Sequence, residues 1–580
     1  MLRKFHILLL LIVPAWGWTQ DSNASAESIR VDIQGLEGEL LENARNHLTA
    51  ALPSCQTTQW KLNRYAKQAT LRIEKSLQAM GYYTPQIRYQ TAVQDACAEL
   101  VYQVEPGPAT VFRDIDIQVQ GAGSEYDSLM ELVGRLPLVE GERLRHDNYS
   151  RSKDALLSTA ISGGFLDSYF IKSSLDIYSQ KQVVDVELLL DTGQQYRLGE
   201  ISFEQSKTVL QEQLLHKLIQ PQLDGIYSQE LLSEMRQSLS IADYYKRIDF
   251  VTSVDKQAHR VNVHIQLQPG AKYEYTVGGG VSTDEGPRLR LGYDNYRVNT
   301  KGDRYAIDGT FSGVSQELTF VYQRLGHDPG KQSWDYSIGL RREEIDAGES
   351  TTASIGAAYS KRTDNGWNNT TSLEWLYEDF SEQGRDETTL LLIPGYSWSF
   401  SRSDRPFYTS KGLRTSMTLK GADQQLLSDA SFVSLTADLK WIRSLNARSR
   451  IILRGGIGAI ATSDFDELPL SLKYFAGGDS SIRGYSYKSV GPEDSNGRLV
   501  GGRFLAELSS EFEYRVYGDW GAAVFMDAGD AFSDDFDLKR GVGIGVRWYS
   551  PVGPIRIDIG HGLDDPENNI QLHFSLGQDI

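Results

Sequence analysis

The sequence predicts an all-β transmembrane barrel of about 16 antiparallel strands, preceded by three α+β domains of β-α-α-β-β order. Three observations predict this fold class. An apolar, cleavable segment opens the chain, a similar series of elements recurs three times up to residue 270, and residues 271–580 form short alternating strands without a helical stretch. We therefore expect the main domain boundary near residue 270.

Residues 1–20 have the pattern of a secretory signal peptide. A charged start precedes an apolar run from Ile7 to Ala15, which small and polar residues follow. The run is about half of the roughly 20 residues that a membrane-spanning helix needs, so an anchor helix is the weaker interpretation. Cleavage after either Gly17 or Ala24 fits the pattern. We expect the mature chain to be exported.

The composition limits the partners of the exported chain. A net charge of -18 argues against nucleic acid, whose phosphates require a basic surface. The two cysteines, Cys55 and Cys97, both lie in the N-terminal part, where an oxidising compartment would let them pair. The alternative is two buried free thiols. We favour one disulfide.

The first 270 residues contain a threefold repeat. In each copy a turn followed by an aromatic residue comes before the last two strands, and an alternating strand then ends at a second turn. The predicted domains are 27–107, 108–193 and 194–270. The aromatic steps are Gly81-Tyr82-Tyr83, Gly164-Phe165 and Asp243-Tyr244-Tyr245, and the closing turns are Glu105-Pro106-Gly107, Asp191-Thr192-Gly193 and Gln268-Pro269-Gly270. Three unrelated small α+β domains are the alternative.

Residues 271–580 alternate between an apolar and a polar face. In the stretch 541–549, Val542, Ile544, Val546 and Trp548 oppose glycines, Arg547 and Tyr549. This alternation suits a barrel with a lipid-facing outside and a wet lumen, although a soluble sandwich would alternate as well. We favour the barrel for three reasons: the signal segment, the length of the stretch without a helix, and the aromatic residues at the strand ends. Those aromatic residues are Tyr293, Tyr296, Trp398, Phe400, Trp548 and Tyr549.

Two short motifs narrow the family. Ile482-Arg483-Gly484-Tyr485 lies in a long loop about 100 residues before the end of the chain, and Phe525-Met526-Asp527-Ala528-Gly529 lies in a following strand. Together with the repeats, which resemble POTRA (polypeptide-transport-associated) domains, they resemble the outer-membrane protein assembly factor superfamily. That family carries a (Val/Ile)-Arg-Gly-(Phe/Tyr) motif on its sixth extracellular loop, which folds back into the lumen, and a Phe-x-Asp-x-Gly strand.

The resemblance implies that Arg483 pins its loop inside the barrel. Alternation places Phe525 and Asp527 on one face, and Glu507, Glu511 and Glu513 share a face in the preceding strand. A guanidinium among such carboxylates makes strong bidentate hydrogen bonds. We therefore expect Arg483 to bind Asp527, with Ile482, Gly484, Tyr485 and Gly529 completing the site. The alternative is a solvated surface arginine of little energetic value.

Three repeats before such a barrel resemble the translocation and assembly module type, TamA, most closely. The resemblance implies an outer-membrane location with the N-terminal domains in the periplasm, unfolded outer-membrane protein clients such as autotransporters, and a TamB-like inner-membrane-anchored partner. The end of the chain departs from the family, since the sequence continues past Phe574 to Gly-Gln-Asp-Ile580 rather than ending on an aromatic residue.

We also expect a seam between the first and last strands that opens laterally. The first strand, near 272–282, contains Gly278-Gly279-Gly280, and glycine weakens a strand. Its expected pairing partner runs over about 569–577 and contributes Leu572 and Phe574. Opening this seam would expose an edge to which a client strand can add. The alternative is that the glycines merely face a crowded lumen.

The sequence gives no support for enzymatic activity, a cofactor or a metal site. Gly541, Gly543 and Gly545 alternate along a strand rather than open a helix, no Gly-x-Ser-x-Gly elbow occurs, and the nine histidines lack His-Glu-x-x-His spacing. The other functions that we consider are a two-partner-type secretion pore, which exports a polypeptide through the lumen, and a passive diffusion channel. Three periplasmic repeats disfavour both.

Overall fold

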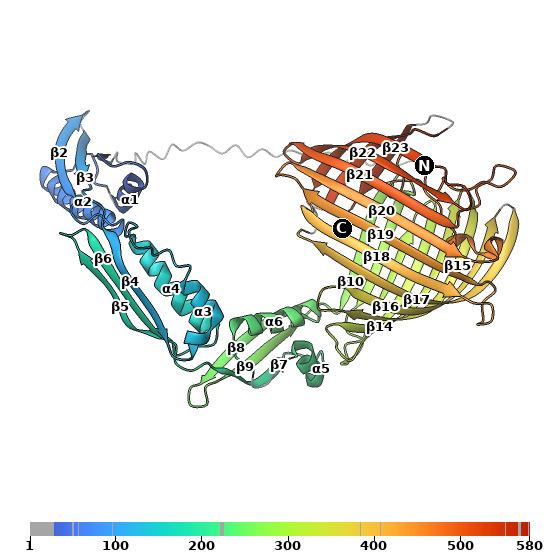
Figure 1. Ribbon diagram of the computed structural model, residues 1–580, viewed down its shortest axis with the longest axis horizontal. Coiled ribbons are helices and arrows are strands. Elements are labelled where there is room, and N and C mark those ends of the chain that lie inside the picture. Colours follow the sequence, from blue (N-terminus) through green and yellow to red (C-terminus); the bar gives the residue numbers. More distant parts are fainter. Residues whose placement is uncertain are drawn as a thin grey trace, which may run out of the picture. The chain divides into compact units, whose positions relative to one another are not determined.

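A computed structural model describes residues 28–48, 52–55, 57–94, 97–220, 225–382, 384–405, 408–550, 553–565, 570–577 and 579. The predicted signal segment lies outside these residues. The chain divides into two compact units: the first holds the first two N-terminal domains, and the second holds most of the third domain and the barrel. Figure 1 labels many of the elements of each.

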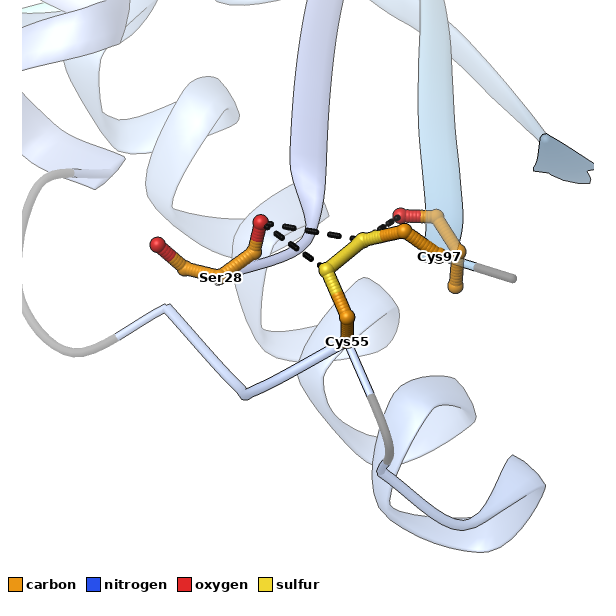
Figure 2. Close-up of a disulfide and its surroundings, with 4 residues drawn as sticks. Ser28, Cys55 and Cys97 are labelled. Carbon is orange, nitrogen blue, oxygen red and sulfur yellow. Dashed lines mark hydrogen bonds between the residues drawn. A yellow bond between two sulfur atoms is a disulfide. The ribbon is translucent and has the colours of Figure 1, made fainter. Parts of the chain in front are cut away.

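The first domain has two helices against a three-stranded sheet. Its elements are β1 (Arg30–Gln34), α1 (Gly38–Leu48), α2 (Gln59–Ala79), β2 (Gln86–Gln94) and β3 (Cys97–Glu105), in the sheet order β1-β3-β2. The core packs the apolar face of α2 against alternate residues of β3, among them Ile73, Leu77, Leu100 and Tyr102. Cys55 and Cys97 form the expected disulfide, beside the carbonyl oxygen of Ser28 (Figure 2).

The second and third domains repeat this arrangement. The second contains β4 (Val111–Gln120), α3 (Asp127–Val133), α4 (His146–Ser162), β5 (Tyr169–Tyr178) and β6 (Val183–Asp191), and the third contains β7 (Arg197–Gln205), α5 (Glu212–Ile219), α6 (Gln229–Ile241), β8 (Tyr245–Asp255) and β9 (Arg260–Pro269). Their sheet orders are β4-β6-β5 and β7-β9-β8. In each domain the last strand in sequence is the central strand of the sheet, and its alternate side chains are buried.

Sixteen strands form one antiparallel sheet in sequential order from β10 to β25. Their lipid-facing and inward-facing side chains alternate because successive residues of a strand point to opposite faces. The strands are β10 Tyr273–Ser282, β11 Gly286–Asn295, β12 Arg304–Phe311, β13 Ser315–Leu325, β14 Gln332–Ile345, β15 Gly348–Arg362, β16 Asn368–Glu382, β17 Arg385–Ser403, β18 Lys411–Ala422, β19 Phe432–Ser444, β20 Ser449–Ala461, β21 Phe504–Tyr517, β22 Trp520–Phe532, β23 Lys539–Ser550, β24 Gly553–Gly562 and β25 Ile570–Leu576.

The inside of the barrel is polar and its outside is apolar. In β22, Val524 and Met526 are each 53% exposed, whereas Phe525 and Asp527 are buried. This distribution is the reverse of a soluble fold and fits a wall between lipid and a polar lumen. No helix among the described residues is both long and apolar enough to cross a membrane.

One of the expected strand-end aromatic residues lies elsewhere. Tyr549 points inward, is 9% exposed and donates a hydrogen bond to Glu513 Oε2 at 3.1 Å. Its neighbour Trp548 is on the outer face, stacked on Trp520 with ring centroids 5.9 Å apart. Tyr549 follows the alternation of β23, which places it on the side of Arg547, so it belongs to the lumen and not to an interfacial girdle.

The expected pairing of the first and last strands is absent from the described residues. β10 pairs with β11 along its whole length, and β25 pairs with β24, but no main-chain ladder joins β10 to β25, although the two strands lie next to each other. The wall therefore carries one seam that main-chain hydrogen bonds do not seal.

Candidate functional site

The loop between β20 and β21 spans residues 462–503 and folds into the barrel. Two lysines of this loop bind carboxylates of the barrel wall: Lys473 Nζ lies 2.5 Å from Glu382 Oε2, and Lys488 Nζ lies 2.9 Å from Glu343 Oε1. Both glutamates are buried. These contacts hold the stem of the loop, so that its tip, Ile482-Arg483-Gly484-Tyr485, reaches the opposite part of the wall.

Arg483 makes the bidentate contact with Asp527 that the sequence predicts. Its Nε and Nη2 donate to the two oxygens of Asp527 at 2.8 and 3.0 Å, and its main-chain N–H donates to Asp527 Oδ2 at 3.1 Å. The arginine is 3% exposed and the aspartate 0%. One carboxylate of β22 therefore fixes both the side chain and the backbone of the loop tip.

Three further groups complete the surroundings of the guanidinium. Nη1 donates to Glu511 Oε2 at 2.6 Å and to Asp558 Oδ2 at 3.2 Å. The ring of Phe525 covers the guanidinium plane, with its centroid 3.5 Å from the Cζ atom. Phe525 and Asp527 share a face of β22 because they are two residues apart. The motif thus supplies a ring for the cation's face and a carboxylate for its edge.

A second buried arginine, Arg547, belongs to the same network, and sequence reasoning assigned it no role. It is 0% exposed and donates to Glu511 Oε1 at 2.7 Å, Glu513 Oε1 at 3.0 Å and Asp558 Oδ1 at 2.5 Å. Alternation already places Arg547, Glu511 and Asp558 on inward faces, which is the signal that could have identified them. Glu507 instead accepts a hydrogen bond from the hydroxyl of Ser481 in the loop.

Glycines of the wall make room for the loop backbone. A Cβ atom on Gly541 would lie 1.9 Å from the carbonyl oxygen of Arg483, and one on Gly560 would lie 2.8 Å from the amide nitrogen of Gly484. Gly484 itself has a φ of +98°, a conformation that favours glycine. Gly541 and Gly560 therefore have a packing role, because a side chain at either position would collide with the loop tip.

The buried charges of this site stabilise the loop only as a set. Removing water from an ion costs several kcal/mol, and only close, well-oriented partners offset that cost. Arg483 and Arg547 together face Asp527, Glu511, Glu513 and Asp558, and every one of these carboxylates has an arginine within 3.2 Å. The arrangement is suited to positioning a loop.

One cluster within the described residues could offer ligands to a metal ion: Asp284, Asp479 and His573 place ligand atoms within 4.8 Å of one another. However, His573 Nε2 accepts a hydrogen bond from the Gly484 N–H at 2.9 Å, and its Nδ1 contacts Asp479 Oδ1 at 2.6 Å. An imidazole with its proton on Nδ1 satisfies both contacts and leaves no free ring lone pair for a metal. The cluster serves as a hydrogen-bonded link.

The structure leaves the glycines of the expected seam uncrowded. A Cβ atom on Gly279 or Gly280 would meet nothing within 4 Å, and one on Gly278 would meet only Arg290 Cβ at 3.7 Å. The alternative of a crowded lumen is therefore wrong for these positions. On the other side of the seam, Leu572 is 54% exposed and Phe574 is half-buried.

Comparisons with known proteins agree with this architecture. A family model described as the Omp85 superfamily domain matches residues 255–580, and a model for TamA POTRA domain 1 matches residues 30–106. The outer membrane protein assembly factor BamA of Nitratidesulfovibrio vulgaris is 32% identical over 134 residues, which cover 21% of this chain and 17% of that protein. BamA of Neisseria meningitidis serogroup B is 20% identical over 471 residues, 69% of this chain and 58% of that protein.

Among solved structures, BamA from Haemophilus ducreyi lacking POTRA domains 1-3 has the same fold, with a TM-score of 0.68, 15% identity, and coverage of 81% of this chain and 99% of that one. The chain spans about a sixth of the length of the Nitratidesulfovibrio vulgaris protein and somewhat more than half of the length of the Neisseria meningitidis protein. The Omp85 match covers more than half of this chain. The chain therefore belongs to the Omp85 superfamily, as an outer-membrane β-barrel protein with N-terminal POTRA domains in the periplasm.

Proposed function

We propose that the chain is an outer-membrane insertase component that assists the assembly and secretion of β-barrel proteins such as autotransporters by opening the seam between β10 and β25. The observation that carries this proposal is the absence of a main-chain ladder between these two strands among the described residues. An unsealed edge can accept a client strand by main-chain hydrogen bonding, which keeps the client's backbone polar groups paired as it enters lipid.

The composition of β10 supports an opening at this place. Gly278, Gly279 and Gly280 contribute no side-chain packing to the wall, and two of the three have open space where a side chain would be. Glycine lowers the stability of a strand because it packs nothing and loses more backbone entropy on folding. Parting β10 from β25 thus breaks few contacts compared with parting any of the laddered pairs.

The periplasmic domains support a role in receiving extended chains. Each three-stranded sheet ends in an edge strand, β2, β5 and β8. In the second domain, β5 carries exposed apolar side chains, among them Tyr169, Ile171 and Tyr178. An edge of this kind can bind an extended peptide through its main chain with little demand on sequence.

The proposal includes no enzymatic step. The client's own folding and the burial of its apolar surface would supply the driving force. It also includes an inner-membrane-anchored, TamB-like partner, because the first domain matches the model for TamA domain 1. A two-partner-type secretion pore remains the competing function, and it would require loop 462–503 to leave the lumen.

A reversible lock across the seam tests the proposal. The Phe574 N–H lies 3.4 Å from Thr283 Oγ1, which marks a point where the two sides of the seam approach each other, and cysteines replacing Thr283 and Phe574 form the lock when they are oxidised. The purified protein is reconstituted in liposomes with a labelled autotransporter client. We expect no insertion by the oxidised form and recovery after reduction.

Wild-type protein treated with the same reductant is the control, because the reductant also opens the Cys55–Cys97 disulfide. Client insertion by the oxidised double-cysteine protein at the rate of the reduced form would refute lateral opening. Polypeptide export that continues with the seam locked, without insertion, would favour the secretion pore.

A further inference from the structure

Asp579, which follows β25 in the sequence, is bound inside the lumen. It lies three residues beyond Leu576, the last residue of β25, and is 1% exposed. Its Oδ2 accepts hydrogen bonds from Arg450 Nη1 at 2.6 Å and from the Thr409 N–H at 2.9 Å, and its Oδ1 accepts one from Arg556 Nη2. These three donors come from three places in the wall: the turn between β17 and β18, strand β20, and strand β24.

The receiving site is built independently of the tail. Arg450 Nε donates to Glu513 Oε2 at 2.5 Å, and its Nη1 also donates to the carbonyl oxygen of Thr409 at 2.9 Å. The ring of Tyr408 lies over the guanidinium, 4.3 Å from the Cζ atom to the centroid. Because other groups already orient Arg450, the fork that faces Asp579 is preformed for a carboxylate.

A second inward contact comes from β25 itself. His573 is 5% exposed and joins the Gly484 N–H of the loop tip to the carboxylate of Asp479. The N–H of Asp479 in turn donates to Asp284 Oδ2 at 2.8 Å, in the turn after β10. Side chains and the loop therefore connect the last strand with the first hairpin, at a seam where the described residues show no ladder.

We propose that Arg450, Arg556 and the Thr409 N–H form a carboxylate-binding site whose occupant is the chain's own Asp579, and that this tether holds β25 toward the lumen and keeps the seam from being sealed by β10. This proposal extends the proposed function, and its significance for client insertion rests on that function. The effect of the Asp579 contact on the position of β25 can be measured without a client.

The test measures the distance across the seam. Cysteines replacing Val281 in β10 and Leu572 in β25, both on the outer face and 50% and 54% exposed, carry spin labels for double electron–electron resonance in lipid nanodiscs. The native cysteines form a disulfide and do not take up the label. The distance distribution is compared among the parent protein, D579N, R556Q and the double variant.

We expect D579N and R556Q each to shift or broaden the distribution, because a charged hydrogen bond is lost and the ratio of released to tethered tail rises on the order of tenfold. The double variant should match D579N, since that change already removes the charge to which Arg556 binds. D519N is the matched control: Asp519 is exposed and lies in the turn between β21 and β22 at the same end of the barrel, and among the described residues it accepts a hydrogen bond through its main-chain oxygen alone.

Heat-modifiable migration on gels verifies that each barrel is folded, and a chain ending at Gly577 serves as a second variant should D579N not fold. Folded D579N and R556Q with the parental distance distribution would overturn the proposal, as would an equal change in D519N. A shifted distribution with unaltered client insertion would support the tether and count against lateral opening, so the two proposals fail separately.

Discussion

Replacing Arg483 with alanine should release the tip of loop 462–503 from the barrel wall. Asp527 is fully buried, and Arg483 is the only cation in an ion pair with it among the described residues. The substitution therefore leaves an uncompensated buried carboxylate. Glu511 and Asp558 are less affected, because Arg547 stays within 2.7 and 2.5 Å of them.

The size of the effect follows from the loss of one partner of a buried pair, which costs about 3–5 kcal/mol. Since each 1.4 kcal/mol changes an equilibrium about tenfold, the ratio of released to bound tip should rise by roughly two to three and a half orders of magnitude. Hydrogen–deuterium exchange of the Gly484 amide reports this ratio, because that N–H is bound to His573 only when the tip is seated.

Two variants sharpen the measurement. R483K keeps the charge but loses the planar fork, so its exchange should lie between those of the wild type and R483A. R498A removes an arginine of the same loop that is 48% exposed and pairs with Asp494, and an exposed pair is worth little. Wild-type exchange of the Gly484 amide in R483A, or equal acceleration in R498A, would refute the reasoning.

Three further predictions concern other contacts. G484A should loosen the tip in the same exchange assay, because a Cβ atom there would lie 2.6 Å from the Gly562 amide nitrogen of the wall, whereas G497A, which also has a positive φ of +75° but lies in an exposed turn of the same loop, should not. C55S/C97S should lower the free energy of unfolding of the first domain by about 4 kcal/mol, given the 42-residue separation; an unchanged denaturation midpoint would count against this. Burial lowers the pKa of His146, which contacts Tyr83 between the first two domains, so the folded protein binds fewer protons than the unfolded chain. Its stabilising contribution is complete above the unfolded pKa of about 6.5 and is lost as pH falls below it, so the calorimetric melting temperature of these domains should fall on acidification more in the wild type than in H146Q.

Local patterns were sufficient to predict the repeats and the strands. Alternation depends only on the period of a strand, so it placed Phe525, Asp527 and Glu511 on inward faces that the structure bears out. The contact between Arg483 and Asp527 was predictable for a different reason. Two motifs 44 residues apart resemble a known pair, and no period or spacing alone would have joined them.

The inward network and the seam could not be predicted in the same way. Arg450 and Asp579 are 129 residues apart, and each resembles any other polar residue of an inward face. Alternation also carries no information on whether the first and last strands pair, because both strands alternate equally well with or without a ladder. That outcome depends on where β25 is held, and therefore on contacts of single side chains with a distant part of the wall.

The seating of the loop tip within the lumen can be measured directly by crosslinking. The hydroxyl of Ser481 contacts the carboxylate of Glu507 on the inner face of β21. Cysteines at these two positions, treated in intact cells with a short bifunctional thiol reagent, should give an intramolecular crosslink in high yield. No crosslink, together with ready labelling of residue 481 by a membrane-impermeant maleimide, would show the loop outside in solvent and contradict the account.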